Sequence, residues 1–211
     1  MKGSLRTVLN IVMVCLLAAG AFFYVKNVSE KKENAFEYEE ARKIATSTQS
    51  TETVQKTEEY KENKPREYDP VVEQLIATDL KALQEINPEV VGWVYIPETE
   101  IDYPVLQHSD NEYYLNHSWE NTKNPNGAIF FDCETSLDLT DFNTLVYGHR
   151  INNKLMFSGL SKFNSLEYIN AHPSVYLVTE KGVCRYDIFS AYQTGMQTIA
   201  FAMRIETENM R

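Results

Sequence analysis

Alternating apolar and polar positions predict that the second half of the chain is built mainly from β-strands. Val91 to Ile96 is rich in aromatic and branched side chains, which strands favour. Pro97 to Thr99 turns the chain and Ile101 to Leu106 returns, so these segments are expected to form a hairpin. The same pattern predicts further strands at Ala128–Phe131, Asn143–Tyr147, Val175–Val178 and Cys184–Tyr192, the last two as a hairpin across Thr179–Gly182.

A helical period precedes the first strand. Asp69 is a suitable N-cap and Pro70 suits the first helical position. Apolar residues then recur at about 3.6-residue spacing until Asn87-Pro88, and they are Val71, Leu75, Leu80, Leu83 and Ile86. Short helical segments are expected at Asp110–Leu115, Leu155–Phe163 and Leu166–Ile169. Together these elements predict a mainly β, barrel-like domain with short helices and an N-terminal helix.

An uncharged apolar run, Val8 to Val25, lies near the amino terminus and is 18 residues long, which just spans a bilayer core. Lys2 and Arg6 precede it, so the amino terminus is expected to stay cytoplasmic and the rest to lie outside the cell. A cleaved signal peptide, with Ala18–Ala21 as cleavage region, is the alternative. Because Phe22 to Val25 continue the run, we favour an uncleaved single-pass membrane anchor over residues 1–26.

A polar segment, residues 27–70, separates this run from the domain at 71–211. It is rich in Glu, Lys, Thr and Ser and has no glycine, so it cannot bury enough apolar surface to fold alone. Part of it, near Glu30 to Ala45, is expected to be helical. The whole chain carries a net charge of −10, which argues against nucleic acid as a partner because phosphate binding needs a basic face.

The three cysteines form a poor disulfide framework for an exported domain. Cys15 lies inside the apolar run, and Cys133 and Cys184 are interpreted as incidental thiols. The four histidines are scattered with no paired Cys–His spacing, so no zinc site is expected. We therefore expect neither a metal nor a cofactor.

One histidine stands out by its place at the end of a predicted strand. Asn143 to Tyr147 ends at Gly148, and His149 follows at the tip. A histidine held by a strand and open to solvent suits general acid–base chemistry near neutral pH, whereas an isolated histidine is more often structural. The choice between these two interpretations depends on the surrounding sequence.

Five ordered blocks of sequence supply those surroundings. They are Asn87-Pro-Glu-Val-Val-Gly-Trp-Val-Tyr-Ile-Pro97, Ile101-Asp-Tyr-Pro-Val-Leu-Gln107, Asp110-Asn-Glu-Tyr-Tyr-Leu115, Gly127-Ala-Ile-Phe-Phe-Asp132 and Asn143-Thr-Leu-Val-Tyr-Gly-His-Arg150, followed by Met156-Phe157. From about Val71 to Thr194 the chain resembles a class B sortase, a membrane-anchored cysteine transpeptidase of Gram-positive cell surfaces. The tail 195–211 does not resemble this family. The resemblance implies the sortase β-barrel.

The resemblance also implies a reaction and its partners. A cysteine thiolate cleaves the C-terminal sorting signal of a secreted surface protein, and the thioacyl-enzyme is resolved by an amine of a peptidoglycan precursor. His149 corresponds to the general acid and base, and an arginine stabilises charge on the carbonyl oxygen. Leu115 matches a position near the sorting-signal groove, although simple core packing explains it equally well.

The family's late Thr-Leu-x-Thr-Cys motif and its following arginine do not occur in these 211 residues. From this we predict a barrel that is incomplete at its C-terminus, truncated by a frameshift or present as a fragment, and a chain that is inactive and poorly stable. A non-catalytic, membrane-tethered remnant or peptide-binding module is the alternative function.

Overall fold

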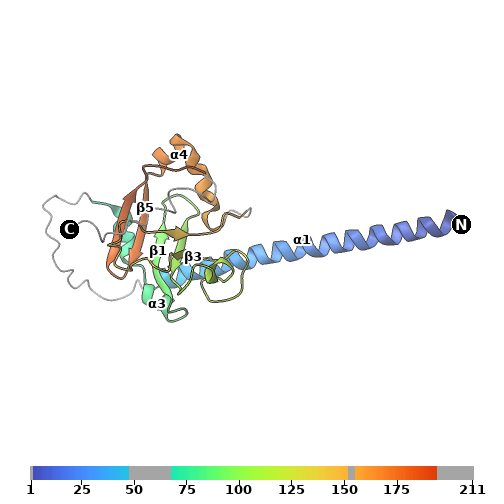
Figure 1. Cartoon of the computed structure of the whole chain (residues 1–211), viewed down its shortest axis with the longest axis horizontal. Coiled ribbons are helices and arrows are strands. Elements are labelled where there is room, and N and C mark those ends of the chain that lie inside the picture. Colours follow the sequence, from blue (N-terminus) through green and yellow to red (C-terminus); the bar gives the residue numbers. More distant parts are fainter. Residues whose placement is uncertain (1, 48–67, 152–154, 194–211) are drawn as a thin grey trace, which may run out of the picture. The chain divides into compact units, whose positions relative to one another are not determined.

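The computed structural model describes residues 2–47, 68–151 and 155–193, and it divides the chain into two units, Met1–Glu40 and Ala41–Arg211. Helix α1 (Lys2–Thr46) begins in the first unit and ends in the second (Figure 1). Among the residues described, no helix is both long enough and apolar enough to cross a membrane. The anchor expected at Val8–Val25 stays a prediction.

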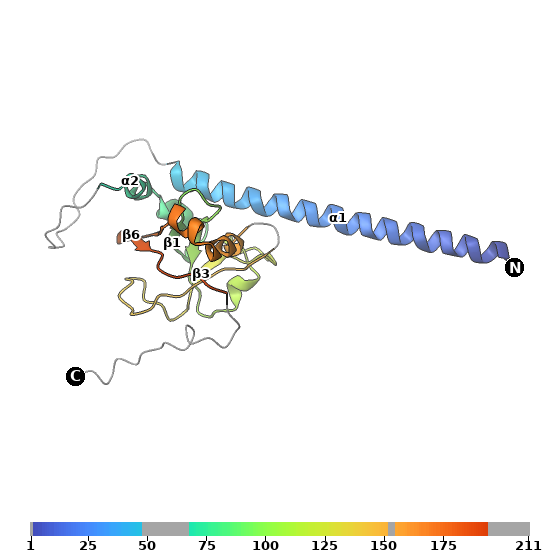
Figure 2. The same ribbon diagram turned by 90° about the horizontal axis from the view of Figure 1, so that it is seen from above.

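The second unit is built on one curled, mainly antiparallel sheet of six strands in the order β4-β3-β2-β1-β5-β6 (Figures 1 and 2). Its short helices lie around the strands, and the expectation of a mainly β, barrel-like domain is confirmed in the form of a half-barrel. The strands are β1 (Val90–Tyr95), β2 (Asp102–Leu106), β3 (Ile129–Phe131), β4 (Val146–Tyr147), β5 (Ser174–Thr179) and β6 (Gly182–Asp187).

Both predicted hairpins form. β1 pairs antiparallel with β2, with Val94 opposite Tyr103, and β5 pairs antiparallel with β6 across the turn at Thr179–Gly182. β3 instead runs parallel to β2, because the loop between them carries the chain back to the starting end of β2. The strand expected over Asn143–Tyr147 is shorter than predicted, since only its last two residues pair with β3.

The core lies at the centre of the sheet, where strand residues are buried on both faces. β3 is buried at all three positions, and β2 is buried at four of its five. These continuous apolar strands differ from the alternating pattern of a sheet with one wet face. The fully buried side chains include Ile101, Tyr103, Leu106, Ile129 and Phe131.

The single helix expected from Val71 to Ile86 is wrong in extent, because the structure divides it into α2 (Pro70–Ile76) and α3 (Leu80–Gln84). The Asp69 side chain caps α2 as predicted, by accepting a hydrogen bond from the Val71 N–H at 3.0 Å. Asp79 caps α3 in the same way, accepting from the Ala82 N–H at 3.0 Å. A second N-cap in mid-segment restarts the helix, and apolar spacing alone does not reveal it.

The compact unit begins at Ala41, and the expected domain bounds stay a prediction. The end of α1 is held to the domain by polar contacts: the Asp79 N–H donates to the Ala45 carbonyl at 2.9 Å, and Arg42 Nε lies 2.9 Å from Asp102 Oδ2. The helix expected near Glu30 to Ala45 falls within α1, while residues 48–67 lie outside the described part.

Three further short helices complete the unit. Two are 3₁₀ helices, η1 (Tyr113–Leu115) and η2 (Phe157–Asn164), and the third is α4 (Leu166–Ala171). Asp110 begins the turn before η1, because its side chain accepts hydrogen bonds from the N–H groups of Glu112 and Tyr113 at 2.8 Å each. Figure 1 shows α4 beyond one end of β5.

Candidate active site

His149 directly follows β4 and Gly148, as the sequence predicts. Two contacts fix its backbone and the preceding residue. The Phe157 N–H donates to the His149 carbonyl at 3.0 Å, and a Cβ on Gly148 would stand only 2.4 Å from Ile129 Cδ1. The same Cβ would stand 2.6 Å from Phe157 Cδ2, so glycine at 148 makes room for η2 beside the residue before His149.

The His149 ring is held by the carbonyl at the end of η1. His149 Nε2 lies 2.7 Å from the Leu115 carbonyl oxygen. Gly127 lies beside this contact, because a Cβ there would stand 3.0 Å from both His149 Cδ2 and the Leu115 carbonyl oxygen and 2.4 Å from the Tyr114 carbonyl oxygen. Gly127 also has φ of +61°, which favours glycine. The imidazole is thus packed between two backbone segments while its edge stays partly exposed to solvent.

A large cavity of about 930 Å³ opens beside this histidine. Gly148 and Arg150, the two neighbours of His149 in sequence, are among the residues that line it, together with Phe157 from η2. The rest of the lining is mainly apolar and includes Ile96, Leu160, Val175 and Ile188. A cavity of this size with a titratable group at its edge is typical of a site for an extended peptide or another organic ligand.

The predicted groove residue Leu115 has a side chain that is 40% exposed, and it is not among the residues lining this cavity. Its carbonyl, rather than its side chain, contacts His149. Its proposed part in binding a sorting signal stays a prediction.

The sortase domain family matches residues 94–210, more than half of the chain and a range that includes His149. The chain belongs to the sortase family. The matched range runs beyond Thr194, where the resemblance noted in the sequence ends.

The relatives of this sortase place it in class B. Sortase B of Listeria monocytogenes is 40% identical over 121 residues, which are 56% of this chain and 48% of the relative. The crystal structure of Bacillus anthracis sortase B in complex with AAEK1 has a TM-score of 0.60 at 31% identity, covering 78% of this chain and 69% of that one. The Staphylococcus aureus sortase B–substrate complex has a TM-score of 0.62 at 25% identity, covering 81% and 69%. The chain spans about half the length of the curated relatives it matches.

Cys133 and Cys184, the two cysteines outside α1, do not lie beside His149. Cys184 is on β6, at the edge of the sheet opposite to β4. Cys133 follows β3, which runs antiparallel to β4, and extending that register puts it five residues, roughly 17 Å at about 3.3 Å per residue, from the position opposite His149. Among the described residues, no group of three or more His, Cys, Asp or Glu side chains could hold a metal ion.

Sequence reasoning missed a polar cluster on the strand that carries His149. The Tyr147 hydroxyl donates to Asp132 Oδ2 at 2.9 Å, and Asn111 Nδ2 donates to the same oxygen at 2.8 Å. Burial, followed by this hydrogen bond and the Asp132 charge, raises the pKa of Tyr147 to about 12. All three residues lie within the motif blocks, but only the fold reveals that they meet.

Proposed function

We propose that this chain carries the histidine and groove of a class B sortase transpeptidase. The proposal rests on one observation: β4 and η1 hold His149 between Gly148 and Arg150, two residues that line a large, mainly apolar cavity. Staphylococcus aureus sortase B has been solved as a substrate complex, and we propose the same class of substrate here, the C-terminal sorting signal of a secreted surface protein.

The proposed reaction has two halves. A cysteine thiolate attacks a backbone carbonyl of the sorting signal, and His149 protonates the departing amine as the peptide bond breaks. An amine of a peptidoglycan precursor then attacks the thioacyl-enzyme, and His149 accepts a proton from it. An arginine stabilises the negative charge that develops on the carbonyl oxygen in both halves.

This reaction requires a thiolate and an arginine close to His149. Cys133 and Cys184 do not provide the thiolate there, so the function needs polypeptide other than the described residues to supply it. The same observation favours a second function, a peptide-binding module that holds a sorting signal without turnover. The predicted inactivity of the isolated chain stays a prediction.

The proposed location is the outer face of the membrane of a Gram-positive cell, with Val8–Val25 as the single-pass anchor. The uncharged length of this run and the cations Lys2 and Arg6 before it support the proposal. Membrane fractionation, followed by alkaline extraction of the membranes, measures it. Release of the chain into the alkaline supernatant would contradict the anchor.

A peptide assay on the 211-residue chain tests the function. A panel of fluorescent sorting-signal peptides is offered with a peptidoglycan-type amine, and binding and cleavage are measured separately. The first function predicts cleavage that appears when a family-like C-terminal segment is appended and that is lost in His149→Ala. Binding without cleavage, even after that segment is appended, supports the second function. Cleavage by the chain that is lost in Cys133→Ala or Cys184→Ala would show that the site is misplaced.

A further inference from the structure

The four histidines of the chain divide into two classes by the ring nitrogen that is hydrogen-bonded to an acceptor. His108, His117 and His172 all use Nδ1, which lies within 2.8–3.0 Å of a Glu89 carboxylate oxygen, the Tyr113 carbonyl and the Pro97 carbonyl respectively. Only His149 makes its hydrogen bond through Nε2, at 2.7 Å from the Leu115 carbonyl, although His108 Nε2 also faces Asp110 Oδ2 at 3.6 Å.

This difference decides which nitrogen of His149 carries the proton. A carbonyl oxygen can only accept a hydrogen bond, so Nε2 must be the N–H donor in the neutral ring. Nδ1 is then the basic nitrogen with a free lone pair. Within the described part of the chain, no hydrogen bond reaches it. Nδ1 is therefore the nitrogen that is open to proton exchange.

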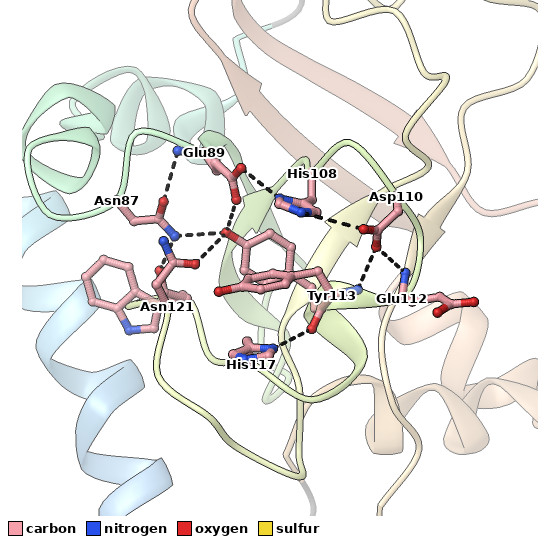
Figure 3. A network of polar contacts seen from close by, with 10 residues as sticks. Asn87, Glu89, His108, Asp110, Glu112, Tyr113, His117 and Asn121 are labelled. Atoms are coloured by element: carbon pink, nitrogen blue, oxygen red, sulfur yellow. Dashed lines mark hydrogen bonds and ion pairs between the residues drawn. The ribbon is translucent and has the colours of Figure 1, made fainter.

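The residue before Leu115 belongs to a partly buried polar network around Asn87 and Glu89 (Figure 3). Tyr114, the preceding residue, is fully buried, and its hydroxyl donates to Glu89 Oε2 at 2.6 Å. The same hydroxyl accepts from Asn87 Nδ2 at 3.0 Å. The Tyr114 carbonyl accepts from the Ala128 N–H at 2.9 Å, which ties η1 to the segment that follows Gly127. Side chain and backbone of Tyr114 thus fix the orientation of the next peptide group.

We propose that Tyr114 is a positioning residue for His149. Its buried hydrogen bonds to Glu89 and Asn87 hold the Leu115 carbonyl against Nε2, which keeps His149 in its Nε2–H tautomer and presents Nδ1 for proton exchange. The catalytic meaning of this arrangement rests on the proposed function. The tautomer itself does not, and it is measured without turnover.

Nitrogen-15 NMR of the full chain, labelled on histidine, tests the proposal. The four histidines give four pairs of ring signals, and His149→Gln assigns the relevant pair. The wild type is expected to show His149 as Nε2–H and His117 and His172 as Nδ1–H. The signals of His117 and His172 therefore serve as references for the Nδ1–H tautomer within the same chain. In Tyr114→Phe, which removes only the hydroxyl, the Nδ1–H fraction of His149 is expected to rise toward its value in the urea-unfolded chain.

Tyr113→Phe is the matched control. Tyr113 is also on η1 and stacks between His108 and His117 at ring distances of 4.4 and 4.0 Å, but within the described residues its hydroxyl makes no hydrogen bond. Its variant is expected to leave the His149 tautomer unchanged.

Each outcome decides the proposal. If the Nδ1–H signals of His117 and His172 also change in Tyr114→Phe, that variant has lost the fold. Glu89→Ala, which keeps the Tyr114 ring, is then measured instead, and the Nδ1–H fraction of His149 is expected to rise in the same way. An Nδ1–H His149 in the wild type, or an unchanged tautomer in the folded variants, overturns the proposal. If the tautomers of His149 behave as expected but no peptide is cleaved, the result counts against the proposed function and not against the role of Tyr114.

Discussion

A polar cluster of three residues and one of five each hold distant parts of the domain together, and they differ in how far their charged side chains reach into solvent. The η1 cluster, Asn87, Glu89 and Tyr114, joins the segment before β1 to η1, and Asn87 and Tyr114 are fully buried. The hairpin cluster joins the α2 cap to the β5–β6 hairpin and comprises Asp69, Ser174, Tyr176, Arg185 and Asp187.

The hairpin cluster is buried at Ser174 and Tyr176 but reaches solvent at its ion pair. The Arg185 and Asp187 side chains are 48% and 78% exposed. Water replaces the partners of an exposed group when a contact breaks, whereas a buried group is left unsatisfied. The η1 cluster is therefore suited to holding a functional group in one orientation, and the hairpin cluster contributes mainly a helix cap and weak ion pairs.

The largest difference in unfolding free energy is expected between alanine variants of two glycines, one in each region. Gly127 and Gly182 both have positive φ, +61° and +125°, so alanine strains the backbone at either site by about 1–3 kcal/mol. Only at Gly127 does the new Cβ also meet backbone, 2.4 Å from the Tyr114 carbonyl oxygen, whereas nothing lies within 4 Å at Gly182. Overpacking adds about 1–3 kcal/mol.

Urea unfolding of Gly127→Ala and Gly182→Ala measures this contrast. Gly127→Ala is expected to lose about twice as much unfolding free energy and to shift the NMR signals of His149. Equal losses in the two variants would show that the η1 region adjusts as easily as the exposed turn.

A smaller difference is expected between Asn87→Ala and Asp69→Ala. Asn87 donates to the Tyr114 hydroxyl and to the Trp119 carbonyl and accepts from the Glu89 N–H, so its loss leaves buried partners unsatisfied at about 1–3 kcal/mol each. Asp69→Ala removes an N-cap, which costs about 1 kcal/mol, together with the hydrogen bond from the Tyr176 hydroxyl and the ion pair with the exposed Arg185. Thermal unfolding measures both variants. A larger loss in Asp69→Ala would show that burial does not make the η1 cluster the stronger of the two.

The smallest effect is expected at Asp138, an exposed carboxylate near the hairpin turn. Hydrogen bonds from the Ser136 hydroxyl and then Thr140 lower its pKa to about 2, and Lys181 Nζ lies 3.8 Å away. Because the folded pKa is lower than the unfolded value of about 3.9, its contribution is complete above about pH 4 and is lost as the pH falls toward about 2.

Comparing wild type with Asp138→Asn over this pH range measures that contribution. The wild type is expected to be slightly more stable at about pH 5, and the difference should vanish near pH 2, around the folded pKa. If the stability difference between wild type and Asp138→Asn grew as the pH falls, the pKa of Asp138 would not be lowered in the folded state.

The sequence by itself determined the local features of this protein. Strand β1, the cap at Asp69 and the position of His149 after a strand all follow from patterns within a few residues, and five ordered blocks carried the family. Such signals need no knowledge of distant residues, because side-chain periodicity and capping are set by neighbours in the chain.

Only the tertiary structure decided which distant segments meet. The parallel pairing of β3 with β2, the attachment of Ala45 to Asp79 and the contact of Leu115 with His149 join residues that no local pattern connects. The tautomer of His149 follows from that last contact, since an acceptor 34 residues away selects the nitrogen that holds the proton. A histidine's place in the chain is local information, but its chemistry depends on the atoms that the fold brings to its ring.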